Sequence, residues 1–179
     1  MPAGDVRTGF FGKMPATGDF VTRRLPHDFV QNWDRWISGH LVPLQTAGTW
    51  AEGVGLRFLL GPDAMGPMAG VVLPSADRIG RRFPLTLAAP FGHMTAGFLA
   101  AAGAWFDILE AAAAAAIEGT IGADDLAAEL GDCSVPAVPA GPPVQGMVFA
   151  TAVVEPVAVD QDAPRRVLER LLLVGSEIP

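Results

Sequence analysis

The polar side chains most able to do chemistry are concentrated in residues 75–84, which hold a serine, an aspartate and three arginines. Ser75 and Asp77 are residue types found in hydrolases, where a nearby base takes the proton of the attacking serine. The sequence places no histidine beside Ser75, and the G-x-S-x-G and S-x-x-K patterns of known nucleophiles are absent. A hydrolase would therefore require the fold to bring a histidine within hydrogen-bond reach of Ser75.

The arginines of this segment, Arg78, Arg81 and Arg82, allow two further interpretations. Ion pairs with Asp77 would hold the loop in one shape and give it a purely structural role. An exposed arginine-rich loop would instead suit binding, because the forked guanidinium donors match carboxylate and phosphate groups. The structural, binding and catalytic hypotheses all remain open at this point.

A second candidate segment begins with Gly9-x-x-Gly12-Lys13, in which glycines and a lysine could surround a phosphate. A phosphate loop has four residues between its glycines and a Ser or Thr after the lysine, whereas this chain has two residues and then Met14. We therefore interpret the glycines as permitting a tight turn, with nucleotide binding as the alternative. One cysteine and three scattered histidines offer no metal-ligand spacing, so we expect no metal and no other cofactor.

Composition limits the classes of partner. Of the 179 residues half are hydrophobic, and the net charge of −7 divides into +2 for residues 1–92 and −9 for residues 93–179. So acidic a chain is a poor ligand for nucleic acid, and we expect no nucleic-acid partner. The longest uncharged stretch, 83–106, is interrupted by Pro84, Pro90 and Gly92, which argues against membrane insertion. Without a secretory signal in residues 1–7 or a second cysteine, we expect a cytoplasmic protein.

The elements that must position these residues follow from hydrophobic periodicity and turn residues. A helix should start at Pro26 and end before Pro43, with Trp33 and Trp36 on its buried face. Further helices are expected at about 94–117, 124–130 and 163–174, and strands at 8–12, 57–60, 70–73, 83–89 and 146–154. Residues 131–145, rich in Pro and Gly, should form an irregular loop. The mixture predicts a single α+β domain over residues 1–179, with a largely antiparallel sheet flanked by helices.

Three stretches together resemble the signature segments of the TagF family of type VI secretion accessory proteins. They are residues 9–21 (GFFGKMPATGDFV), 25–36 (LPHDFVQNWDRW) and 73–85 (LPSADRIGRRFPL). Their order and spacing also resemble the family's. Each alone is a weak signal, but the combination is specific.

The resemblance implies a post-translational regulator, a repressor, that engages a scaffold protein with a forkhead-associated domain. It brings no catalytic residues, so we expect a binding protein and not an enzyme. The candidate partner-binding residues are Lys13, Asp19, Ser75, Asp77, Arg78, Arg81 and Arg82. The residues assigned to the structural part of the motifs are Gly9, Gly12, Pro15, Gly18, Trp33, Trp36, Gly80 and Pro84.

Overall fold

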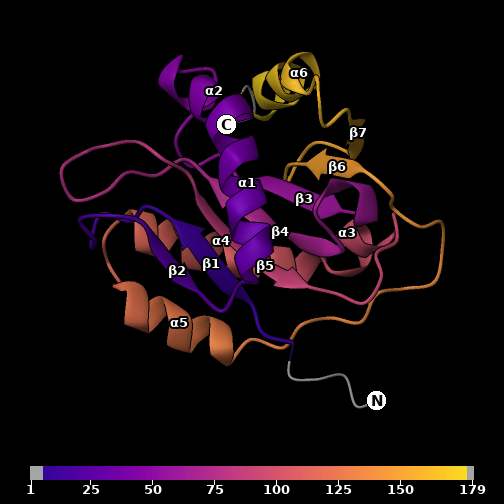
Figure 1. Cartoon of the computed structure of the whole chain (residues 1–179), viewed down its shortest axis with the longest axis horizontal. Helices are drawn as coiled ribbons and strands as arrows, with labels where there is room; N and C mark the ends of the chain where they lie inside the picture. The colour runs from indigo at the N-terminus through magenta and orange to yellow at the C-terminus, as the bar shows by residue number, and fades with distance from the viewer. Residues whose placement is uncertain (1–5, 177–179) are drawn as a thin grey trace.

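An antiparallel sheet of seven strands runs through the centre of the computed structural model, which describes residues 6–176 (Figure 1). The strands are β1 (Gly9–Gly12), β2 (Val21–Arg23), β3 (Leu56–Leu60), β4 (Met68–Leu73), β5 (Leu85–Pro90), β6 (Met147–Ala150) and β7 (Val157–Val159). Their order across the sheet is β2-β1-β5-β4-β3-β6-β7. Every neighbouring pair is antiparallel, which confirms the predicted α+β class with its antiparallel sheet.

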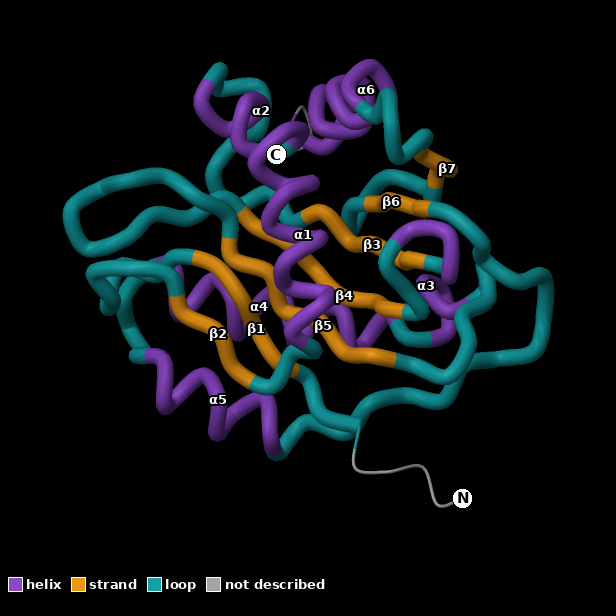
Figure 2. The backbone as a smooth tube through the Cα atoms, viewed as in Figure 1, coloured by secondary structure: helices purple, strands orange, loops and turns teal. Residues whose placement is uncertain are grey.

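Helices cover both faces of this sheet and make three layers (Figure 2). On one face lie α1 (His27–His40), α2 (Val42–Thr46) and α6 (Arg165–Ser176); on the other lie α3 (Phe98–Ala101), α4 (Gly103–Ile117) and α5 (Ala123–Gly131). A short 3-10 turn, η1 (Pro62–Ala64), follows β3. Within residues 6–176, no helix combines the length and the apolar character that crossing a membrane requires.

The alternation of side chains along the central strand β3 explains the two cores. Leu56, Phe58 and Leu60 point into the core that contains α1, while Leu59 points into the core that contains α4. Successive strand residues face opposite sides of a sheet, so an all-apolar strand is expected where both sides are covered. Arg57 is the exception in this strand, and it lies on the α4 side.

The α1 side of the core is built from stacked aromatic rings. Trp33 and Trp36 are both buried, and their ring centroids lie 5.3 Å apart. The Trp33 indole Nε1 donates a hydrogen bond of 2.8 Å to the Thr86 hydroxyl on β5. The Trp36 Nε1 donates to the Gln161 carbonyl at 3.0 Å. Both tryptophans therefore fix α1 on the sheet through packing and one polar bond each.

The predicted helix at 94–117 is wrong in its first third. Ala102 leaves the helical conformation with φ −103° and ψ 22°, which divides the segment into α3 and α4. Residues 94–96 are not helical because their backbone pairs with the 131–145 loop: Ala96 N–H donates to the Pro142 carbonyl, and Val144 N–H donates to the Met94 carbonyl. The long-range bonds to this loop replace helical ones.

Other elements differ from the prediction in their limits. β2, β7 and α2 were not predicted; the first two have only three residues each, and Pro43 lies in the first turn of α2 instead of excluding a helix. The strand predicted at 83–89 begins later, at Leu85, and that predicted at 146–154 ends earlier, at Ala150. On α4, Ile108 is half exposed, whereas Phe106 is buried.

Arg57 joins β3 to α4 through two ion pairs. Its Nε lies 2.6 Å from Glu110 Oε1, and one terminal nitrogen lies 2.6 Å from Asp107 Oδ1. Burial alone would lower the pKa of Arg57, but the hydrogen bonds to the two carboxylates raise the pKa above its ordinary value. This contact directs Glu110 towards the sheet.

Candidate functional site

The two candidate segments meet because their parent strands are neighbours. β1 pairs with β5 in antiparallel register, with Phe11 opposite Thr86. The end of β1 therefore lies beside the start of β5, and the loop after β1 meets the loop before β5. We call residues 13–20 and 74–84 the paired loops. Their contact joins parts of the chain that are about sixty residues apart.

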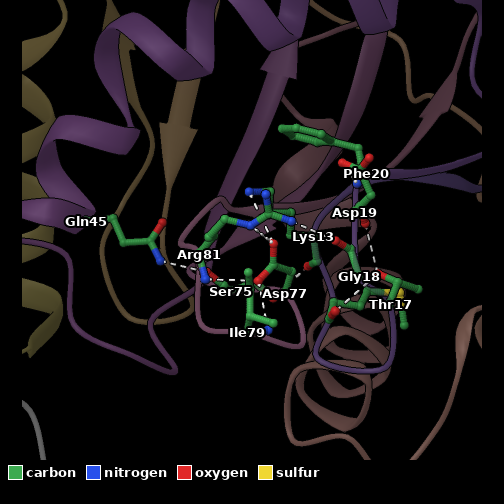
Figure 3. Close-up of polar contacts among 11 residues, drawn as sticks. Lys13, Thr17, Gly18, Asp19, Phe20, Gln45, Ser75, Asp77, Ile79 and Arg81 are labelled. Atoms are coloured by element: carbon green, nitrogen blue, oxygen red, sulfur yellow. Dashed lines mark hydrogen bonds and ion pairs between the residues drawn. The ribbon is translucent and has the colours of Figure 1, made fainter.

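The carboxylate of Asp77 lies at the centre of the paired loops (Figure 3). Oδ1 accepts hydrogen bonds from the backbone N–H of Ile79 at 3.1 Å and of Arg81 at 2.9 Å. Oδ2 accepts one from Arg81 Nε at 2.7 Å and lies 3.5 Å from the Lys13 Nζ. The Asp77 side chain has no exposed surface, so its charge is balanced entirely within the loops.

Burial of this carboxylate would by itself raise its pKa. The opposing hydrogen bonds from the backbone and side chain of Arg81 and from the backbone of Ile79 outweigh burial and lower the pKa of Asp77 to about 2. Asp77 is therefore ionised at neutral pH and holds the turn that carries the arginines. This is the behaviour of a structural carboxylate, since a general acid would need a raised pKa.

Four more hydrogen bonds join one loop to the other. The Ser75 hydroxyl donates to the Lys13 carbonyl at 2.7 Å. Arg78 donates twice, from a terminal nitrogen to the Ala16 carbonyl and from its backbone N–H to the Thr17 carbonyl, each at 2.9 Å. Arg81 donates to the Gly18 carbonyl at 2.7 Å. Two of the three family-like segments, residues 9–21 and 73–85, are therefore joined into one hydrogen-bonded structure.

Ser75 is not arranged as a nucleophile. Its side chain is buried, and the hydroxyl hydrogen is directed to a backbone carbonyl and not to a base. A hollow of about 340 Å³ lies beside it, and none of the side chains that line the hollow is a histidine. The geometry that the hydrolase hypothesis requires is therefore not present around this serine.

The first segment also lacks the geometry of a phosphate loop. Its loop leads into strand β2, whereas anion-binding loops present their backbone N–H groups at the start of a helix. Lys13 is buried, with its Nζ directed to Asp77 and lying 4.9 Å from the centre of the Phe20 ring. Among the described residues, no three His, Cys, Asp or Glu side chains are grouped so that they could hold a metal ion.

Two glycines of the motifs have conformations that explain their presence. Gly12 has φ +143°, and a β-carbon there would collide with the Pro84 carbonyl oxygen. Gly80 has φ +88° and closes the turn in which its N–H donates to the Asp77 carbonyl at 3.0 Å. Gly18 has open space around it.

The remaining candidate residues lie outside the hydrogen-bonded centre of the site. Asp19 is exposed, and its carboxylate accepts a bond of 2.8 Å from the Phe20 N–H. Arg82 is exposed and makes no hydrogen bond or ion pair with any described residue. Trp33 and Trp36 belong to the α1 core and do not join the site. Gly9 lies in β1, Pro15 lies in the first loop, and Pro84 is buried just before β5.

Phe20 and Gln45 belong to the site although the sequence reasoning did not single them out. The Phe20 ring stacks on Phe11 at 5.9 Å and meets Phe83 edge-on at 4.8 Å, while remaining 47% exposed. Gln45, on α2, donates from Nε2 to the Ser75 carbonyl at 2.9 Å. An apolar residue at the end of a polar loop was a usable signal for Phe20; the short α2 gave none for Gln45.

Comparison with known proteins extends the resemblance beyond these loops. Residues 9–133 match the family profile described as TagF N-terminal domain, type VI secretion system-associated. The crystal structure of PA0076 from Pseudomonas aeruginosa PAO1 is similar with a TM-score of 0.61 and 27% identity, over 94% of this chain and 76% of that one. A search of curated proteins finds no match. The matched segment is more than half of the chain and includes both paired loops, so this protein belongs to the TagF N-terminal domain family of type VI secretion-associated proteins.

Proposed function

We propose that this protein is a cytoplasmic repressor of type VI secretion that acts after translation. It binds a scaffold protein of the system that contains a forkhead-associated domain, and it catalyses no reaction. Family membership supports the association with type VI secretion. The repressive role, the partner and the compartment are the parts that this proposal adds.

The observation that carries the proposal is how the paired loops use their polar groups. Ser75, Asp77 and Lys13, the groups that catalysis would need, satisfy one another or the backbone. Arg78 and Arg82 remain exposed on the outside of the same loop. Such an arrangement suits a rigid, cationic binding surface because the loop is already ordered before a partner arrives.

The binding test uses the purified protein and the purified scaffold in isothermal titration calorimetry. A double variant, Arg78→Glu with Arg82→Glu, reverses two exposed charges and leaves the Arg81–Asp77 pair intact. We expect affinity to fall at least about tenfold. Arg166→Glu, on the exposed side of α6, is the matched control and should bind like the unmodified protein. Unchanged affinity in a folded double variant would exclude the loop as the contact surface.

The direction of regulation is tested in cells with an active type VI system. Deleting the gene should increase the amount of secreted substrate in culture supernatants, and overproduction should decrease it. Ser75→Ala should retain this repression, since the proposal gives Ser75 no catalytic role. Lower secretion after deletion would identify an activator. Loss of repression in a folded Ser75→Ala variant would support a catalytic role for Ser75.

A further inference from the structure

The hollow beside Ser75 lies where the two helical layers come together at one end of the sheet. Gln45 of α2 comes from one layer, and Ile117, the last residue of α4, comes from the other. Glu52 and Arg82 also line the hollow. It has a volume of about 340 Å³.

Gln45 lines the hollow and holds an unsatisfied acceptor. The side chain is 8% exposed, and its Nε2 is used by the Ser75 carbonyl. Its Oε1 is buried and has no hydrogen-bond donor among the described residues. Buried carbonyl oxygens are normally paired, because a missing bond leaves the oxygen without the donor that water would supply.

Arg82 gives the hollow a positive charge that makes no ion pair with a described residue. Arg81 is paired with Asp77, and Arg78 donates to Ala16, whereas Arg82 has no partner among residues 6–176. Asp77 is fully buried and pairs with Lys13 and Arg81, so its carboxylate does not neutralise the charge of Arg82. The opposing charge that lines the hollow belongs to Glu52. No hydrogen bond or ion pair joins Glu52 to Arg82 in the described structure.

We propose that this hollow is a docking pocket for an acidic segment of a partner protein. The carboxylate of the segment pairs with the Arg82 guanidinium, and Ile117 contacts its apolar part. Glu52 opposes a second carboxylate and so favours a segment with a single acidic side chain at this point. The identity of the partner rests on the proposed function; the chemistry of the pocket does not.

The first test uses the opposite signs of Arg82 and Glu52, with the type VI scaffold protein as the probe. Arg82→Glu should weaken binding at least about tenfold, and Glu52→Gln should tighten it about two- to fivefold. Binding should also weaken as the salt concentration rises. If Glu52→Gln weakens binding, or if Arg82→Glu leaves it unchanged, the pocket does not take an acidic segment of this partner.

The second test separates the pocket from the identity of the partner. The probe is a blocked six-residue peptide with one central glutamate among alanines, titrated into the full chain and followed by NMR through the Gln45 side-chain amide and the Arg82 Nε–H. We expect both signals to shift with this peptide, and not with the same peptide carrying lysine in place of glutamate, and the shifts to vanish in Arg82→Glu.

The two probes give distinguishable outcomes. If the peptide shifts these signals but the scaffold does not bind the unmodified protein, the proposed partner is wrong and the docking pocket is supported. If the scaffold binds but the peptide leaves both signals unmoved, the proposed function stands and the acidic-segment pocket is wrong.

Discussion

Arg57 provides a test of how burial sets the strength of an ion pair, because it makes two pairs of equal length. Both Glu110 and Asp107 lie 2.6 Å from its guanidinium group. The two carboxylates differ in exposure: the Glu110 side chain is 22% exposed and that of Asp107 is 73% exposed. The perturbation is to remove each charge separately, with Glu110→Gln and Asp107→Asn, each alone and combined with Arg57→Met.

The expected magnitudes differ because water screens one pair more than the other. A hydrogen bond to a charged group away from water contributes about 1.5–3 kcal/mol, and we expect a coupling of that size between Arg57 and Glu110. An exposed pair contributes about 0.2–1 kcal/mol, which we expect between Arg57 and Asp107. In a chain of this size, 1 kcal/mol changes Tm by about 2–4 °C, so the two cycles should be distinguishable.

The assay is urea denaturation followed by tryptophan fluorescence, which yields the free energy of unfolding for each single and double variant. Each coupling energy comes from a double-mutant cycle, which cancels effects that the variants share with their surroundings. Repeating the measurement in 1 M NaCl should reduce the Asp107 coupling more than the Glu110 coupling. Equal couplings, or a larger value for Asp107, would refute the reasoning from burial.

Three further predictions concern the paired loops and the core. Gly12→Ala should lower the free energy of unfolding, measured by urea denaturation, by at least about 2 kcal/mol, because Gly12 has a positive φ and its added β-carbon would collide with Pro84. The control Gly18→Ala should change it by no more than about 0.5 kcal/mol. Equal losses of stability in the two variants would contradict the loop geometry. Thr86→Val removes the acceptor of the buried Trp33 N–H and should cost about 1–3 kcal/mol in the same assay, and no loss would show that the bond is not needed. The folded-state pKa of Asp77, about 2, lies below its ordinary value of 3.8, so its contribution to stability is present above pH 4 and is lost as the pH falls towards 2. The free energy of unfolding should therefore fall less steeply between pH 4 and 2 in Asp77→Asn than in the unmodified protein. An unchanged slope would show that protonation of Asp77 does not cause the loss of stability in acid.

The sequence predicted those parts of the fold that carry a local signal. The apolar runs of β3 and β4 and the aromatic face of α1 were visible as patterns, since strand and helix periods differ. β2 has only three residues, two of them exposed and polar, so no hydrophobic pattern marks it. The non-helical conformation of residues 94–96 depends on hydrogen bonds to the 131–145 loop, whereas an Ala-rich sequence alone favours an uninterrupted helix.

The site was predictable in composition but not in arrangement. The residues of the two loops could be chosen as polar and glycine-rich segments, yet nothing local shows that Ser75 donates to the carbonyl of Lys13. That contact depends on β1 and β5 being neighbours, and strand order is a property of the whole sheet. The ion pairs of Arg57 could not be predicted for a similar reason, because its partners lie about fifty residues later in the chain, in the helical layer that contains α4. The unmatched oxygen of Gln45 becomes visible only once the chain has folded around it.

The pairing of β1 with β5 also bears on how the protein folds. Strand pairs that are distant in sequence close large loops, and folding slows as the average separation of contacting residues grows. The paired loops can form only after β5 has been added beside β1, so a nascent chain that ends before residue 85 lacks them. A peptide copied from either loop alone should therefore fail to imitate the protein. In the proposed role, a partly synthesised or partly unfolded copy would be unable to restrain secretion, and the ability to bind would report that folding is complete.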